Sequence, residues 1–212
     1  KHEGISFLLL PMDQDGVTIK PIRMISGESP FNETFFDDAL ADKRDLVGDL
    51  NRGWTVGKRL LQHERSGMES LAAGGTGGGL ASVVTTAKKG YGERDGKIAE
   101  PTIRENVLRY EMDSRTLGLT QRRVVEESLD GKTPGFTTSI FKVVSTELQQ
   151  DYYELQTGLR GTDGYGWEGE QFEEDALGLT RNWLYYRAAS IYSGSNEVQR
   201  NIIAKRVLGL PD

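Results

Sequence analysis

Two long stretches decide the fold class: IRENVLRYEMDSRTLGLTQRRV at residues 103–124 and IFKVVSTELQQDYYEL at residues 140–155. Within each stretch the apolar residues recur three, four or seven positions apart, which places them on one face of an α-helix. Gly131 and Pro134 follow the first stretch and end its helix. The pattern therefore predicts two long amphipathic helices, whose buried faces carry Ile103, Val107, Tyr110, Leu117 and Val124 in the first and Ile140, Val144, Leu148, Tyr152 and Leu155 in the second.

Further helices are predicted on both sides of this pair. Val56, Leu60, Met68 and Leu71 keep the helical period through one long element that starts at Gly53 and extends to about residue 88. The five glycines of residues 158–169 indicate a loop, and residues 172–189 and 196–208 supply two more helices. Long helices with short connections are typical of an up-and-down bundle, so we expect a mainly α protein.

The first fifty residues have a β pattern instead. Strands are predicted at residues 5–10, 17–22 and 34–36, separated by turn residues. Three short strands make a poor domain by themselves, so we expect them to belong to a sheet whose other strands precede Lys1. The predicted organisation is a partial β-domain at residues 1–50 followed by a helical bundle at residues 51–212.

Composition excludes several classes of function. The chain has no cysteine and only two histidines, which argues against disulfides, a thiolate nucleophile and a metal site. Its formal charge of −6 argues against nucleic acid as the main partner. No run of 18 apolar residues is present, so we expect no membrane span, and without a targeting signal in these residues we expect a cytoplasmic protein.

Glu64 is the first candidate site residue. On a helix it shares a face with Val56, Leu60 and Met68, yet it is a carboxylate. A carboxyl group on an apolar face loses hydration, and its pKa is expected to rise toward a value suited to a general base. The alternative is a side chain at the edge of the apolar stripe that reaches solvent or a distant arginine.

The segment Ser193-Gly-Ser-Asn-Glu197 is the second candidate, at the start of the last predicted helix. Ser195 suits the N-cap position, and Glu197 suits the positive end of the helix dipole. The exposed N–H groups of this turn could hold an anionic oxygen or an oxyanion that develops during a reaction. The alternative is helix capping without any ligand.

Several of these segments resemble the acyl-CoA dehydrogenase family. Residues 191–211, IYSGSNEVQRNIIAKRVLGLP, resemble the C-terminal signature of that family. Residues 16–22 and 31–38 resemble its middle β-domain, and LLQHER at residues 60–65 resembles the helix that follows. The resemblance covers essentially the whole chain in order, and it implies the C-terminal helical bundle of that family preceded by the end of its β-domain.

This resemblance implies a flavoenzyme that oxidises an acyl-CoA thioester to the trans-2-enoyl-CoA. A carboxylate removes the α-proton while FAD takes a hydride from the β-carbon, and the electrons pass to an electron-transfer flavoprotein. Relatives form dimers or tetramers that share flavin contacts across subunits. We therefore expect a homo-oligomer, or a heteromer with a paralogue.

The resemblance also implies roles for individual residues. The family's commoner base lies in a Tyr-Glu-Gly step, where this chain has Ser193, and its less common base lies at Glu64. Glu64 is therefore expected to act as the base, with the backbone N–H of Ser193 bound to the thioester carbonyl. Arg65 matches an arginine near the acyl-CoA.

Three further residues match flavin-binding positions. Ser195 and Glu197 match positions that contact the flavin, where relatives often have Thr and Gln. The family's Arg-x-x-Phe-Gly motif for the flavin pyrophosphate is absent, and Arg94 is the candidate in that region. The missing motif and Ser193 leave two alternatives open: a catalytically silent subunit that partners an active paralogue, and a helical interaction module without cofactor.

Overall fold

The computed structural model describes residues 2–61, 79–130 and 138–211 of the 212-residue chain. The chain forms two compact units, Lys1–Leu71 and Ala72–Asp212. Each unit is described by itself below.

The first unit is built around a β-hairpin. β1 (Val17–Ile22) pairs antiparallel with β2 (Phe31–Phe36), with Val17 opposite Phe36 and Ile22 opposite Phe31. The strand predicted at residues 17–22 is confirmed, and the one predicted at 34–36 begins three residues earlier. Most of the ribbon is exposed, including large apolar side chains at Ile19, Ile22, Phe31, Phe35 and Phe36. A two-stranded ribbon of this kind is marginally stable alone.

The strand predicted at residues 5–10 is wrong. The structure has only isolated bridges there, between Ile5 and Arg52 and between Leu8 and Leu46. The two partners are six residues apart, Leu46 just after the 3-10 turn at Lys43–Asp45 and Arg52 just before the helix that starts at residue 53. One bridge is antiparallel and the other parallel, so they do not form a continuous ladder. Gly53 fits because a Cβ there would overlap the backbone of Phe7.

Of the range predicted as one long helix from Gly53 onward, the structure describes residues 53–61 and those from Gly79 onward. Residues 53–61 are helical in the first unit, and α2 (Gly79–Tyr91) is the first helix of the second unit. Residues 62–78 lie outside the described residues. In the first unit the indole of Trp54 stacks on the imidazole of His2, with ring centroids 4.3 Å apart.

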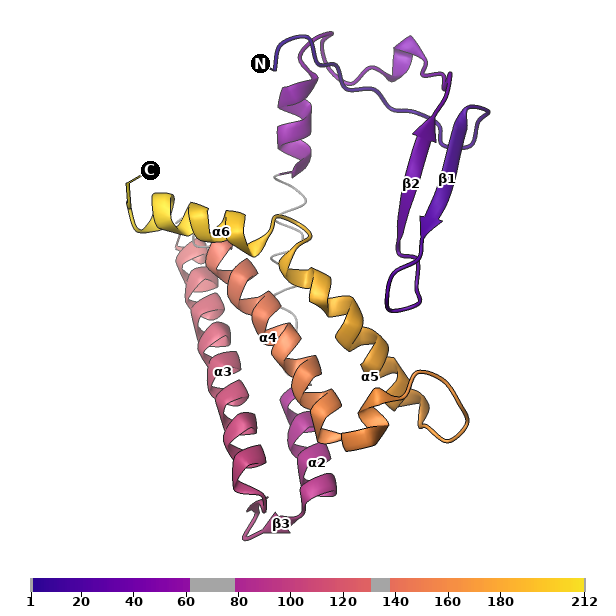
Figure 1. Ribbon diagram of the computed structural model, residues 1–212. Coiled ribbons are helices and arrows are strands. Elements are labelled where there is room, and N and C mark those ends of the chain that lie inside the picture. Colours follow the sequence, from indigo (N-terminus) through magenta and orange to yellow (C-terminus); the bar gives the residue numbers. More distant parts are fainter. Residues whose placement is uncertain (1, 62–78, 131–137, 212) are drawn as a thin grey trace. The chain divides into compact units, whose positions relative to one another are not determined.

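The second unit is the predicted bundle of long antiparallel helices (Figure 1). α3 leads away from the β3–β4 end, α4 returns to it, and α5 runs back alongside α4. The loop predicted at residues 158–169 is partly helical, and the last two predicted helices each change type near their ends. The elements after α2 are β3 (Glu93–Arg94), β4 (Lys97–Ile98), α3 (Pro101–Leu129), α4 (Thr138–Leu159), η3 (Gly161–Tyr165), α5 (Glu174–Tyr185), η4 (Tyr186–Ser190), α6 (Asn196–Ile202) and the π-helical turn η5 (Ile203–Val207).

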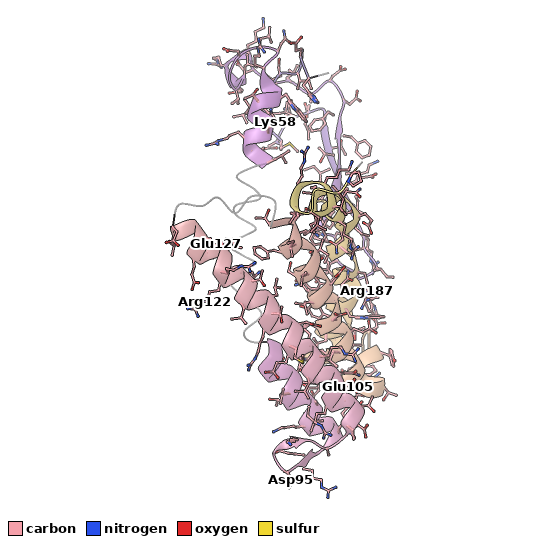
Figure 2. All side chains as sticks on the ribbon, turned by 90° about the vertical axis from the view of Figure 1, so that its left-hand side faces the viewer. Lys58, Asp95, Glu105, Arg122, Glu127 and Arg187 are labelled. Atoms are coloured by element: carbon pink, nitrogen blue, oxygen red, sulfur yellow. The ribbon has the colours of Figure 1, made fainter. Side chains whose placement is uncertain are left out.

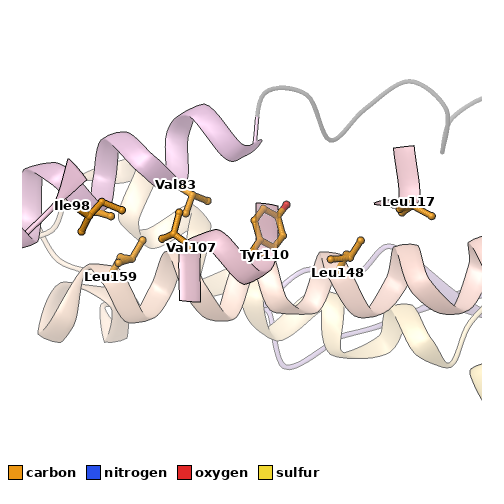
Figure 3. Packing of buried hydrophobic residues seen from close by; sticks show 8 residues of the cluster. Val83, Ile98, Val107, Tyr110, Leu117, Leu148 and Leu159 are labelled. Atoms are coloured by element: carbon orange, nitrogen blue, oxygen red, sulfur yellow. The ribbon is translucent and has the colours of Figure 1, made fainter. Parts of the chain in front are cut away.

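The core of this unit lies between α2, α3 and α4 (Figure 3). Of the periodic positions of residues 103–124, Val107, Tyr110, Leu117 and Val124 are buried as predicted, and Ile103 is partly buried. Leu148 and Leu159 of α4 complete the cluster with Val83, Ala87 and Ile98. Burial of each such side chain contributes about 1.5–3 kcal/mol, so this cluster is the main source of the bundle's stability.

A tight hairpin precedes α3 and was not predicted. β3 and β4 are joined by Asp95 and Gly96, whose φ angles of 51° and 75° are both positive. Asp-Gly is the preferred pair for such a type I′ turn. Pro101 then starts α3, as expected for a residue that lacks an N–H, and the Glu100 carboxylate accepts a hydrogen bond from Thr102 N at 3.1 Å.

The outer surface of α3 carries charged side chains, and some of them form ion pairs with residues one helical turn away (Figure 2). Glu105 pairs with Arg109 at 3.0 Å, and Arg122 pairs with Glu126 at 2.8 Å, both four residues apart. Such exposed pairs contribute about 0.3–0.5 kcal/mol each. Within the described part of the chain, no helix is both long enough and apolar enough to cross a bilayer.

Candidate active site around Ser193

The structure describes four of the six residues predicted for the site. Ser193, Ser195 and Glu197 lie together where the chain enters α6, and Arg94 lies in β3. Glu64 and Arg65 lie outside the described residues. The four described site residues all belong to the second unit.

Ser193 and Gly194 form a left-handed turn between η4 and α6. Their φ angles are 55° and 86°. Positive φ is natural for glycine but costs a residue with a Cβ about 1–3 kcal/mol, and strain of this kind is held by the surrounding structure and often marks a functional position. At Gly194 a Cβ would lie 2.7 Å from Gln199 Nε2, the mobile end of a side chain, so the positive φ is the stronger reason for glycine there.

This turn presents an unused backbone donor. Ser193 and Gly194 are both exposed. The N–H groups of Ile191 and Tyr192 donate to the Ala188 carbonyl at 2.9 and 3.1 Å, but that of Ser193 has no acceptor among the residues that the structure describes. It is a preoriented donor, the kind of group that stabilises negative charge as it develops on an oxygen.

Ser195 and Glu197 cap α6, as the simpler interpretation predicted. The Ser195 hydroxyl accepts a hydrogen bond from Val198 N at 3.4 Å. The Glu197 carboxylate bonds to its own backbone N–H and to the Ser195 side chain, and these contacts hold its pKa below the usual value, with Arg200 adding to the effect. Glu197 is thus a carboxylate at neutral pH that sits at the positive end of the helix.

Three side chains of α4 hold the segment around the turn, and the sequence analysis missed them. Lys142 Nζ donates to the Ala189 carbonyl at 2.5 Å. Gln150 Nε2 lies 3.1 Å from the Tyr186 carbonyl and from Ser190 Oγ. Thr146 Oγ1 lies 3.1 Å from the side-chain nitrogen of Asn196, a residue only 2% exposed. These residues are four apart in the sequence, so they form one polar face of α4.

The Lys142 ammonium is half-buried and, within the described residues, forms no ion pair. Desolvation lowers its pKa from the usual value. Its remaining interaction is with the face of the Tyr192 ring, whose centroid is 5.5 Å away. A cation at the carbonyl end of a helix is favourable, and here it stabilises the end of η4.

Ion pairs fasten the flanking helices to α4. Arg200 of α6 pairs with Glu147. The Glu154 carboxylate accepts hydrogen bonds from Trp183 Nε1 at 2.7 Å and from Arg187 at 2.5 Å. Arg187 is labelled in Figure 2. The hydrogen bond from Trp183, and then Arg187, lowers the pKa of Glu154.

A hollow of about 350 Å³ lies between α3 and α4. It is lined in part by three carboxylates, Asp113, Glu147 and Asp151. Burial raises the pKa of Asp151, and Glu147 and Asp113 raise it further. Like charges repel, so this hollow does not suit an anionic ligand.

Arg94 lies apart from the turn. The β3–β4 hairpin follows α2, and a Cβ at Gly90 of α2 would lie 3.4 Å from the Leu159 carbonyl at the end of α4. Asn196, next to the turn, contacts Thr146, which lies 13 residues before Leu159 on α4. Thirteen residues of α-helix span roughly 20 Å. Within one chain the structure therefore does not bring Arg94 to Ser195 and Glu197.

Comparison with known proteins decides the family. The family model described as "Acyl-CoA dehydrogenase, C-terminal domain" matches residues 51–208. The chain belongs to the acyl-CoA dehydrogenase family. Over the full 212 residues it is 36% identical to "Acyl-CoA dehydrogenase IpdE1" of Mycolicibacterium smegmatis, and it covers 50% of that protein. The chain thus spans about half the length of the curated relatives that it matches.

Solved structures show that the fold is that of acyl-CoA dehydrogenases. "Tcur3481-Tcur3483 steroid ACAD" superposes with a TM-score of 0.82 at 24% identity, over 99% of this chain and 53% of that one. The ChsE4-ChsE5 complex from Mycobacterium tuberculosis superposes with a TM-score of 0.75 at 24% identity, over 99% and 53% of the two chains. At this identity the likeness concerns the fold alone.

Proposed function

We propose that the protein of which this chain forms part is an FAD-dependent acyl-CoA dehydrogenase that converts an acyl-CoA thioester to the trans-2-enoyl-CoA. The observation that carries the proposal is the unused N–H of Ser193, held in a left-handed turn within the family's C-terminal signature. That N–H would bind the thioester carbonyl oxygen. Arg65 would contribute to binding the acyl-CoA.

Each residue would have a defined part in the reaction. Glu64 would take the α-proton, and the Ser193 N–H would stabilise the enolate-like charge that then develops on the carbonyl oxygen. FAD, when bound, supplies the acceptor for the hydride that leaves the β-carbon. An electron-transfer flavoprotein would receive the electrons afterwards.

Three described residues would contact the flavin in this proposal. The Ser195 hydroxyl accepts from Val198 N and donates to the ionised Glu197, which can only accept, so a polar group of the flavin would replace the Ser195–Glu197 bond. Arg94 is exposed and keeps a charge that suits a pyrophosphate. Because Arg94 lies apart from the turn, it would contact the flavin of a neighbouring subunit, in a homo-oligomer or in a heteromer with a paralogue.

A second candidate function is a silent subunit that partners an active paralogue. It is favoured by Ser193, because a serine at the family's commoner base position cannot take an α-proton. In that case Glu64 would have no part in catalysis. The cofactor-free interaction module is the third alternative.

The test is reduction of the bound flavin in the full-length protein. The proposal predicts a yellow protein whose flavin absorbance bleaches anaerobically on addition of at least one member of an acyl-CoA panel. Bound flavin that no acyl-CoA reduces would favour the silent subunit. A colourless protein that takes up no added FAD would favour the interaction module.

A further inference from the structure

The left-handed turn at Ser193 lies between two anchored points. Before it, η4 is bound by α4 at both of its ends: Gln150 binds the carbonyl of its first residue, Tyr186, and Lys142 binds the carbonyl of Ala189 near its last residue. After it, the buried Asn196 side chain is bound by Thr146 of the same helix. Residues 191–195 connect these anchors: the N–H groups of Ile191 and Tyr192 donate to the Ala188 carbonyl, and the strained Ser193 follows them.

The anchors account for how the strain is held. A helix end leaves carbonyls without intrahelical partners, and a donor that binds them fixes where the chain leaves the helix. Gln150 Nε2 reaches the carbonyls of Tyr186 and Arg187 at 3.1 and 3.3 Å as well as Ser190 Oγ. With both ends fixed to one rigid helix, the short connection has little choice of backbone conformation.

We propose that Lys142 and Gln150 are positioning residues, which fix η4 against α4 and thereby aim the Ser193 N–H at the thioester carbonyl. This inference rests on the proposed function. Neither side chain touches substrate in this account; both act through the turn. A displacement of the N–H by about 1 Å is enough to cost roughly a hundredfold in rate.

The prediction concerns the limiting rate rather than substrate binding. The hydrogen bond from Ser193 strengthens as charge develops on the carbonyl oxygen, so its misplacement weakens the transition state more than the bound ground state. We therefore expect Lys142→Met and Gln150→Met to slow flavin reduction at saturating acyl-CoA by about tenfold to a hundredfold. The half-saturating concentration should change by no more than about threefold.

The experiment is anaerobic stopped-flow reduction of the full-length flavoprotein by the acyl-CoA that reduces the wild type best. Gln149→Met is the matched control, since Gln149 is the neighbouring residue of the same type on α4 and forms no hydrogen bond with residues 186–196 in the described structure. It should retain the wild-type rate within about twofold. FAD content and circular dichroism are measured for each variant.

The outcomes separate this inference from the proposed function. Slow reduction with FAD content and circular dichroism unchanged supports the positioning role. Rates equal to that of Gln149→Met, or rates that fall only in proportion to lost FAD, overturn it while the proposed function stands. If Lys142→Met does not fold, Gln150→Met gives the same test. A wild-type flavin that no acyl-CoA reduces would refute the proposed function, and this inference with it.

Discussion

Replacing Thr146 by Val should destabilise the bundle far more than the loss of one hydroxyl suggests. The Asn196 side chain is buried, and its amide nitrogen and oxygen lie 3.1 and 3.2 Å from Thr146 Oγ1. Valine has nearly the same shape, so packing is kept but the amide loses its described partner. A buried polar group left unpaired costs about 1–3 kcal/mol. We expect the free energy of unfolding, measured by urea titration with circular dichroism, to fall by that amount.

Thr116→Val provides the control. The Thr116 hydroxyl also donates to the carbonyl four residues earlier, Met112 at 2.8 Å, as Thr146 does to Lys142 at 2.8 Å. Thr116 is exposed and has no buried amide to satisfy, so its replacement should cost no more than about 0.5 kcal/mol. Equal losses in the two variants would refute the reasoning. In addition, Asn196→Leu should cost less in the Thr146→Val background than alone, by about 0.5–3 kcal/mol.

Three other predictions follow from described contacts. Gly16→Ala should lower stability by at least about 1–3 kcal/mol in a thermal melt, because φ is +87° there and a Cβ would overlap the Asp37 carbonyl; an unchanged melting temperature would contradict this. Glu154→Gln should destabilise by up to about 1 kcal/mol at pH 7. Since the pKa of Glu154 is lowered from 4.5, this difference should shrink as the pH falls below 4.5, and a difference that persisted at low pH would oppose the assignment. Ser193→Gly should preserve both the N–H and flavin reduction, and should leave stability unchanged or raise it by up to about 1 kcal/mol; loss of flavin reduction would count against a backbone role.

Periodicity predicted the helices that local sequence determines. The buried positions of α3 repeat every three, four or seven residues, and the structure buries Val107, Tyr110, Leu117 and Val124 as expected. The segment at residues 5–10 failed because strand pairing depends on a distant partner, and here the two bridge partners lie next to a 3-10 turn and a helix start. Asp95-Gly96 is the opposite case, because this pair favours a two-residue hairpin turn and local sequence is sufficient to predict the β3–β4 hairpin.

The candidate site also combines features that local sequence determines with features that depend on distant contacts. Helix capping by Ser195 was predicted because it depends on the next three residues. The contacts of Lys142 and Gln150 span 47 and 36 residues, and they exist only because α5 and η4 run back along α4. A lysine, a threonine and a glutamine four residues apart indicate a polar helix face, but the sequence does not show what that face binds.

The proposed mechanism depends most on a carboxylate base at Glu64 acting with the Ser193 N–H. The direct measurement is the rate of flavin reduction by acyl-CoA in full-length Glu64→Gln protein that has been loaded with FAD. Glutamine keeps the size of the side chain but cannot take a proton, so we expect a rate about 10²–10⁴-fold below that of the wild type, with FAD still bound. A variant that reduces its flavin within about tenfold of the wild-type rate would show that Glu64 is not the base.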